Sequence, residues 1–295
     1  MLCQTFFREE YQLNYLIGTL SKPFIALIDG VTMGGGVGLS VHGKYRVATE
    51  KTLFSMPETA IGLFPDVGGG YFLPRLPFPG LGAFLALTGH RLNGLEVLWA
   101  GVATHYRPSN EIETLKEALY RLEFPAITCA SDISKINKEI AHLLDARTEK
   151  PVAPVSLAPH MDAIGTIFAL FESGAAVTVE DILRKLEIYS KTGTANKEWA
   201  ETYINILNRM SPTSLKITLR QLQEGSKLSF ADNFKMEFRL SQHCVRRPDL
   251  AEGIRAVLID KDSSPRWDPP HLSLVTKELV DSYFSPIPGV PEWCI

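Results

Sequence analysis

The spacing of hydrophobic positions changes near residue 104 and divides the chain into two parts. Before it, short apolar runs separated by glycines predict buried strands at residues 25–28, 45–48 and 52–54. Helical spacing in the same part predicts helices at residues 6–20, 37–41, 67–76, 81–87 and within 89–103. Alternating short strands and helices predict an α/β fold for this part.

The remainder of the chain is predicted to be mostly helical. Apolar periodicity predicts helices at residues 111–122, 132–144, 159–171, 179–189, 211–222 and 239–262, with a proline-containing link at 151–154. Ser211 and Pro212 form a good helix start, with serine as N-cap and proline at the first helical position. The stripe of Leu215, Leu219 and Leu222 that follows is interpreted as core rather than as a ligand groove.

Three regions follow from these patterns. Residues 1–104 are predicted to form the strand-containing core, residues 105–285 a helical carboxy-terminal region, and residues 286–295, which are rich in proline, a flexible tail. Sixteen of the 22 glycines lie at or before Gly101, so tight turns concentrate in the first region.

Composition bounds the class of protein. The chain has 295 residues, of which 45% are hydrophobic and 21% charged, enough for a sizeable core. A net charge of −3 gives no indication of a nucleic-acid partner, and no apolar run approaches the ~20 residues of a membrane span. The cysteines show no metal-ligand spacing and are expected to be reduced thiols: Cys3, Cys129, Cys244 and Cys294. None of the seven histidines is assigned to catalysis.

A glycine turn at Gly34–Gly36 lies between the apolar run at 25–28 and the helical pattern at 37–41. Unpaired backbone N–H groups at such a helix start, with no Cβ beside them, could bind a substrate oxygen as an oxyanion hole. The alternative is that the glycines only allow tight packing between strand and helix.

Two acids follow the glycine turn on short loops. Glu58 comes after Met56 and Pro57, and Asp66 comes after Pro65 and before a second glycine turn. Two carboxylates near an oxyanion site could divide a hydrolysis, one attacking or activating water and the other managing protons. The alternative is that both acids cap the helices that follow them.

Seven segments together resemble the enoyl-CoA hydratase/isomerase (crotonase) superfamily. They are FFREEY at residues 6–11, MGGGVGLS at 33–40, FSMPETAIGLFPDVGG at 54–69, YFLPRL at 71–76, ALTGHRL at 86–92, MSPTSLKITLRQL at 210–222, and EGIRAVLIDKD with PRW at 252–267. The resemblance covers nearly the whole chain and implies a spiral crotonase core followed by a helical region.

Two positions of the resemblance separate hydrolases from hydratases. Hydratases of the superfamily have a glutamate where this chain has Gly38, and a glycine where it has Asp66. The resemblance therefore implies an acyl-CoA thioester hydrolase, acting on a branched 3-hydroxyacyl-CoA in valine catabolism. It implies no cofactor, since CoA is part of the substrate, no metal, no nucleic-acid or membrane partner, a homo-oligomer and a mitochondrial location.

Roles for individual residues come from the same resemblance. Gly35 would donate its backbone N–H to the thioester oxygen, and Glu58 would be the nucleophile or general base. Asp66 would position or deprotonate water, and which acid attacks stays open. Glu10 matches a substrate-contacting position, although residues 8–10 are equally typical of a solvated helix face.

The amino terminus departs from the superfamily pattern. Superfamily members carry further strands and an A-G-G-D-like loop before the FFREEY segment, and that loop supplies a second oxyanion N–H. We therefore expect the spiral core in residues 1–104 to be incomplete and a longer natural product to be the active form, since one lost donor costs on the order of 10²–10³ in turnover. No targeting segment is visible.

Two rival functions stay open at this point. One is an enoyl-CoA hydratase or isomerase, which Gly38 and Asp66 disfavour. The other is a non-catalytic crotonase-fold binding protein, which the presence of Gly35, Glu58 and Asp66 disfavours.

Overall fold

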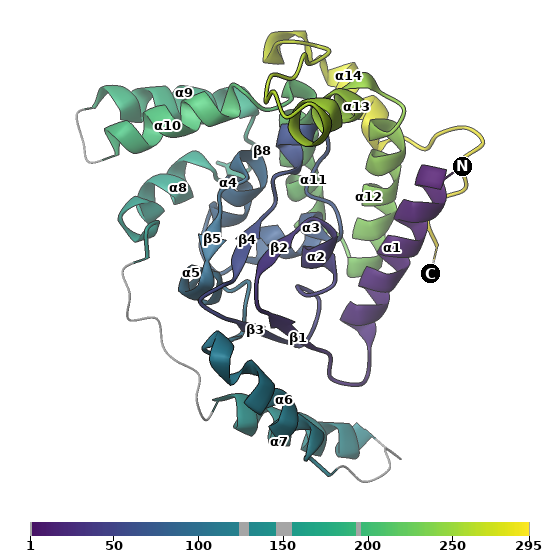
Figure 1. The fold of residues 1–295 in the computed structure, drawn as a ribbon. Coiled ribbons are helices and arrows are strands. Elements are labelled where there is room, and N and C mark those ends of the chain that lie inside the picture. The colour runs from purple at the N-terminus through teal and green to yellow at the C-terminus, as the bar shows by residue number, and fades with distance from the viewer. Residues whose placement is uncertain (1, 124–129, 146–154, 193–195, 295) are drawn as a thin grey trace. The chain divides into compact units, whose positions relative to one another are not determined.

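A computed structural model describes residues 2–123, 130–145, 155–192 and 196–294 (Figure 1). Its strands are β1 Ile25–Ile28, β2 Val31–Met33, β3 Tyr45–Ala48, β4 Leu53–Ser55, β5 Leu92–Asn93, β6 His105–Tyr106, β7 Phe171–Glu172 and β8 Ala175–Ala176. Its α-helices are α1 Leu2–Thr19, α2 Gly35–Gly38, α3 Gly69–Phe72, α4 Leu81–Thr88, α5 Gly94–Trp99, α6 Ile112–Tyr120, α7 Ala130–Asp145, α8 Met161–Ile167, α9 Val179–Lys191, α10 Lys197–Leu207, α11 Pro212–Gly225, α12 Phe230–Cys244, α13 Pro248–Ile254 and α14 Lys277–Phe284.

Single turns of tighter or wider helix connect these elements. The 3₁₀ turns are η1 Glu58–Ile61, η2 Leu73–Arg75, η3 Ser109–Glu111, η4 Ala158–His160 and η6 Leu272–Leu274, and η5 Arg255–Ile259 is a π-helical turn. Among the described residues, no helix is both long and apolar enough to cross a membrane.

Two small sheets contain strands β1 to β6. In one, β1, β3 and β6 lie in that order and all pair in parallel, with Ile25 opposite Tyr45 and Val47 opposite His105. In the other, the order is β2, β4 and β5, and β4 pairs with β5 antiparallel. Parallel pairing of short apolar strands requires crossover connections, which the glycine turns and short helices between them provide.

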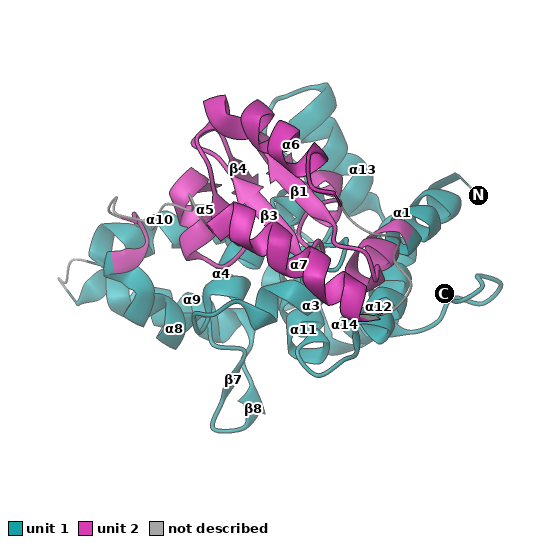
Figure 2. Ribbon diagram, turned by 90° about the horizontal axis from the view of Figure 1, so that it is seen from below, with its two compact units in different colours: residues 1–12, 55–91, 159–295 teal, residues 13–54, 92–158 magenta. Residues whose placement is uncertain are grey.

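The chain forms two compact units, shown in Figure 2. Unit 1 comprises Met1–Gln12, Ser55–Arg91 and Pro159–Ile295, and unit 2 comprises Leu13–Phe54 and Leu92–Ala158. Both units draw on separate stretches of the chain, because each strand or turn packs against a partner far along the sequence. The predicted division into residues 1–104, 105–285 and 286–295 stays a prediction.

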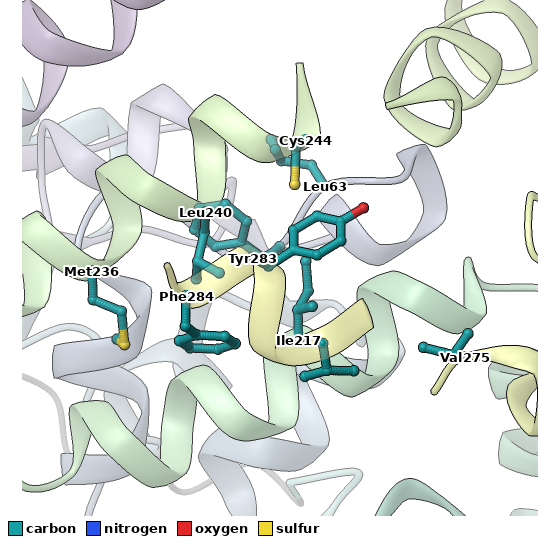
Figure 3. Packing of buried hydrophobic residues seen from close by; sticks show 10 residues of the cluster. Leu63, Ile217, Met236, Leu240, Cys244, Val275, Tyr283 and Phe284 are labelled. Atoms are coloured by element: carbon teal, nitrogen blue, oxygen red, sulfur yellow. The ribbon is translucent and has the colours of Figure 1, made fainter. Parts of the chain in front are cut away.

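The core of unit 1 lies where α11, α12 and α14 meet the loop after η1. Figure 3 shows its buried side chains, which are Leu63, Phe64, Ile217, Met236, Leu240, Cys244, Val275, Val280, Tyr283 and Phe284. Burying a side chain such as that of Phe64 contributes ~1.5–3 kcal/mol. Leu63 and Phe64 stand between Glu58 and Asp66 in sequence, so this core anchors the loop that carries both acids.

The core of unit 2 packs helices against the parallel sheet. Tyr45 and Val47 of β3 contact one face of α6 and α7, through side chains of Ile112, Leu115, Ile136, Ile140 and Leu144. The Tyr45 hydroxyl also donates to the Asn137 carbonyl oxygen at 2.9 Å. The apolar residues of α7 recur at helical spacing, so they lie on one face of the helix and that face packs on the sheet.

Several predicted elements are confirmed and others are wrong in extent. The structure confirms the strands at 25–28 and 45–48, the helix near 81–87, and Ser211 as an N-cap, whose hydroxyl accepts from the Ser214 N–H at 3.0 Å. The helix predicted in 239–262 is confirmed at its apolar positions 251–258, which lie in α13 and η5, but its continuity is wrong. There α12 ends at Cys244, and α13 begins at Pro248, because proline lacks the N–H that would continue the earlier helix. The helix predicted at 67–76 is shorter, since α3 covers four residues and Pro74 forces a 3₁₀ turn.

The segment after α14 packs back onto unit 1. Trp293 is 1% exposed and its ring lies 5.7 Å from that of Phe234. Arg8 donates to the carbonyl oxygens of Pro291 and Glu292 at 2.7 and 3.1 Å. The prediction of a flexible tail did not anticipate these contacts. The predicted link at 151–154 lies outside the described residues.

Candidate active site

The two candidate acids lie on one loop of unit 1, and its backbone is shaped by residues with unusual conformations. Glu58 is the first residue of η1, and Gly62, which follows η1, has φ of 72°. A Cβ at Gly62 would lie 2.3 Å from the backbone of Asp249, so only glycine fits there. Further on, Val67 adopts φ of 50°, which a β-branched residue rarely does, and Gly68 follows with φ of 90°. Backbone strain of this kind persists where surrounding contacts impose it, and it often marks a functional site.

Glu58 is a buried carboxyl without a partner for one of its oxygens. Its side chain is nearly inaccessible, and among the described residues its Oε2 atom has no hydrogen-bond partner. Burial raises the pKa of Glu58 to about 8. The backbone N–H of Glu58 itself, at the start of η1, acts on this pKa in the opposite direction, so the alternative that Glu58 caps the turn stays open. An unpaired buried carboxyl oxygen is available to a substrate or a water molecule.

Asp66 is buried beside other acids and one tyrosine. The Tyr11 hydroxyl donates to its Oδ2 atom at 3.1 Å. Burial, followed by the charges of Glu58, Glu10 and Glu237, raises the pKa of Asp66 well above its usual range, while the bond from Tyr11 acts in the opposite direction. Among the described residues, the hydrogen bond given to the Asp66 side chain comes from Tyr11 and not from α3, which begins after Gly68, so the contacts do not support Asp66 as a helix cap.

Glu10 lies on the part of α1 that belongs to unit 1. It is half-buried, whereas its neighbour Glu9 is exposed, and burial raises the pKa of Glu10. Its charge is one of those that raise the pKa of Asp66. The structure therefore brings together Glu10, Glu58 and Asp66, and the roles given to them by resemblance stay predictions.

Gly35, the fourth predicted residue, belongs to unit 2 and is described there. It is the first residue of α2, and Gly34 before it takes φ of 50° and ψ of −126°. A Cβ added at Gly36 would meet nothing within 4 Å, so this turn has open space beside it. The first N–H groups of any helix lack partners within that helix. The oxyanion role of Gly35 stays a prediction.

The sequence did not identify two residues that lie close to these acids, Tyr11 and Glu237. Tyr11 lies next to Glu10 and reads as an ordinary apolar position of an amphipathic helix, yet it is fully buried against Phe7 and Phe234. Glu237 lies in the middle of α12, where acids usually face solvent, yet it is fully buried. A sign of this burial is present in the sequence. Asn233 and Glu237 lie one helical turn apart, on a face of the helix that is mainly apolar.

The acids of the site do not form a candidate metal cluster with other described residues. Among the residues that the structure describes, no group of three or more histidine, cysteine, aspartate or glutamate side chains is placed to hold a metal ion. Cys3, Cys244 and Cys294 are free thiols, and Cys129 lies outside the described residues. Paired carboxyls with raised pKa values, one hydrogen-bonded to a phenol, can hold, accept and deliver protons near neutral pH.

Comparison with known proteins identifies the class. The chain belongs to the enoyl-CoA hydratase/isomerase family, whose model matches residues 2–284. A solved structure, a carnitinyl-CoA dehydratase from Mycobacterium thermoresistibile, is 32% identical, with a TM-score of 0.80 over 97% of this chain and 75% of that one. This likeness confirms the predicted crotonase fold.

Two curated relatives with about half of their aligned residues identical share one name. The mitochondrial 3-hydroxyisobutyryl-CoA hydrolase of Gallus gallus is 49% identical over 293 residues, covering 97% of this chain and 69% of that protein. The protein of the same name from Danio rerio is 52% identical over 285 residues, covering 97% of this chain and 70% of that protein.

Proposed function

We propose that this chain hydrolyses the thioester of 3-hydroxyisobutyryl-CoA to 3-hydroxyisobutyrate and free CoA, a step of valine catabolism. The observation that carries the proposal is the pair of buried acids, Glu58 and Asp66, held on one loop and coupled through their charges. Two curated relatives that are about half identical over 97% of the chain bear the name of this hydrolase.

Thioester hydrolysis needs a nucleophile and a group that transfers protons, and the two carboxyls can supply both. Water or a carboxylate must attack the thioester carbon, the carbon–sulfur bond must break, and the departing sulfur must gain a proton to become the CoA thiol. If Glu58 attacks, an anhydride forms and Asp66 deprotonates the water that hydrolyses it; if water attacks directly, one acid takes its proton. In the anhydride route Asp66, whose pKa is raised, can first protonate the departing sulfur and then take a proton from the water that hydrolyses the anhydride. In the direct route the acid that takes the proton of the attacking water can pass it to the sulfur.

Further features of the proposal rest on the family and on the relatives' names. The substrate is a small acyl-CoA, and we propose that no separate cofactor is needed, since CoA is part of the substrate. Self-association and a mitochondrial location are proposed too, the latter because the relatives are named mitochondrial enzymes. Nucleic acid and membrane are not among the proposed partners.

Thiol release from 3-hydroxyisobutyryl-CoA by the purified protein tests the function. We expect the wild type to release CoA, and Glu58→Gln and Asp66→Asn each to lower kcat by ~10²–10⁴, since each removes a proton-transferring or attacking group. Glu96→Gln is the matched control. Glu96 is a buried glutamate that accepts from Asn93 and Ser156 backbone N–H groups in unit 2, so its loss should spare turnover.

Two outcomes would contradict the proposal. One is a folded wild type that releases no CoA. The other is strong hydration of crotonyl-CoA without thioester cleavage, which would favour the hydratase chemistry named for other members of the fold.

A further inference from the structure

Glu237 of α12 receives hydrogen bonds from four donors. Its Oε2 atom accepts from the Gly68 N–H at 2.7 Å. Its Oε1 atom accepts from the Gly70 N–H at 2.9 Å, from Asn233 Nδ2 at 2.9 Å and from Gln221 Nε2 at 3.0 Å. The carboxyl therefore lies in a buried pocket lined by donors on both of its oxygens.

This set of donors selects a carboxylate. A carboxylate accepts on both oxygens, whereas a glutamine of the same shape would turn its NH₂ group toward at least one N–H donor. Burial raises the pKa of Glu237 to about 7, and its four hydrogen bonds act in the opposite direction. Charge-assisted bonds to backbone N–H groups are among the stronger ones in proteins.

The bonded turn is the one that follows Asp66. The Asp66 carbonyl accepts from the Gly69 N–H at 2.8 Å, so Asp66 is the first residue of the turn that Glu237 binds. On the other side of Asp66, Gln221 Nε2 donates to the Pro65 carbonyl at 2.8 Å as well as to Glu237. The backbone is thus held immediately before and after Asp66, by two side chains that also contact each other.

Close packing prevents the turn from moving away. A Cβ at Gly70 would lie 2.6 Å from Asn233 Oδ1, and a Cβ at Gly225 would lie 2.1 Å from the Gly70 carbonyl oxygen. Val67, in the middle of the turn, keeps its rare φ of 50° under these constraints. A strained turn of this kind relaxes when the groups that hold it are removed.

We propose that Glu237 is a positioning residue for Asp66: by binding the Gly68 and Gly70 N–H groups, it fixes the turn that aims the Asp66 carboxyl at the reacting centre. The proposal rests on the proposed function, in which Asp66 is one of the two acids that transfer protons. Glu237 itself does not touch substrate in this role. It acts only through the backbone of residues 66–70.

Kinetics of Glu237→Gln in two backgrounds test the proposal. We expect kcat to fall by ~10–100-fold with little change in KM, because misplacing a reacting group by about 1 Å costs as much as 10²-fold. In the Asp66→Asn background the same change should cost less than about threefold, since residues that act as a unit are non-additive. Glu96→Gln should leave kcat within about twofold of wild type in both backgrounds, which separates positioning from a loss of general stability.

A second variant and a second measurement guard against misfolding and against failure of the proposed function. Gln221→Met removes the bonds to Pro65 and to Glu237 while keeping the side chain's length. It leaves both backbone bonds to Glu237 in place, so it should show a smaller loss with the same dependence on Asp66. Hydrogen exchange of the 65–72 peptide, followed by mass spectrometry, should accelerate in Glu237→Gln even without substrate.

The outcomes are distinguishable. An inactive, folded wild type overturns the proposed function, and the exchange rates then decide the positioning claim alone. Equal kinetic losses in the wild-type and Asp66→Asn backgrounds, or unchanged exchange at residues 65–72, would overturn the role of Glu237.

Discussion

Unit 1 contains two clusters of acids that differ in their surroundings. In the first, Glu58, Asp66 and Glu237 are buried, and the pKa of each is raised, first of all by burial. In the second, Glu252 and Asp262 bind the guanidinium of Arg255, with Nη atoms 2.8 and 2.7 Å from their oxygens. That guanidinium lowers the pKa of Glu252 to about 2 and also lowers the pKa of Asp262.

The contrast shows that the same side-chain chemistry serves opposite purposes. Carboxylates paired with arginine at the surface keep their charge and hold a turn in place. Carboxyls that are buried together have raised pKa values, because ionising them inside the protein costs free energy. Groups with such shifted pKa values are concentrated at sites of proton transfer. In the buried cluster, burial of the carboxyls lowers the stability of the folded state near neutral pH and gives them pKa values suited to proton transfer.

The largest expected effect on stability comes from Glu58. An unfolded chain ionises this residue near pH 4.5, whereas the folded chain keeps its proton until about pH 8. Between these values the folded state binds more protons, so the free energy of unfolding falls as pH rises. Glu58→Gln should remove this fall, and its stability relative to wild type should increase from pH 5 to pH 8.5 by on the order of a few kcal/mol.

Urea unfolding at both pH values measures this change. Comparing slopes with pH, rather than stabilities at one pH, cancels any fixed cost of placing an amide in the pocket. Parallel pH dependences for wild type and Glu58→Gln would show that Glu58 ionises normally in the folded protein, and the contrast between the two clusters would fail.

A smaller effect is expected from Tyr11→Phe. Phenylalanine keeps the packing on Phe7 and Phe234 but cannot donate to Asp66. Since the bond from Tyr11 lowers the pKa of Asp66, its loss raises that pKa further, against the background set by Glu58, Glu10 and Glu237.

Activity at pH 7 should then fall by roughly tenfold, the value of about one charge-assisted hydrogen bond, and should recover at higher pH. The pH dependence of kcat measures the shift. Activity that falls equally at all pH values would mean that Tyr11 does not tune Asp66.

The smallest effect is expected in the exposed cluster, from Glu252→Gln. Here the folded-state pKa lies below the unfolded value, so the stabilisation is present above pH 4.5 and is lost as pH falls toward 2. The thermal midpoint should drop by no more than about 2 °C at pH 7, since surface ion pairs contribute little. The drop should shrink at pH 3. A larger loss at pH 3 than at pH 7 would reverse the sign assigned to this cluster.

Local patterns predict the elements whose cause is local. The strand at 25–28, the helix near 81–87 and the cap at Ser211 each follow from a few neighbouring residues. The two acids of the loop were candidates for the same reason, because proline and glycine on both sides mark them as loop residues between apolar runs.

The rest of the site depends on contacts between residues far apart in sequence. Glu237 meets Gly68 across 169 positions and Tyr11 meets Asp66 across 55, and no periodicity within α12 or α1 encodes those partners. The sequence did not predict the shortness of α3 or the break between α12 and α13, because apolar spacing continues across both. The left-handed Gly68 delays the start of α3, and Pro248 separates α13 from α12.

The contacts of α1 also set an order of events during synthesis. Tyr11 packs on Phe234, Arg8 stacks on Phe238 at 4.7 Å, and Arg8 donates to the carbonyl of Pro291, 283 positions away. Because these partners leave the ribosome long after α1 does, α1 has to wait for them, and closing so long a loop is slow. The phenol that contacts Asp66 is therefore locked in place only when α12 and the segment near Trp293 have been made, so a nascent chain carries its acids before it can arrange them.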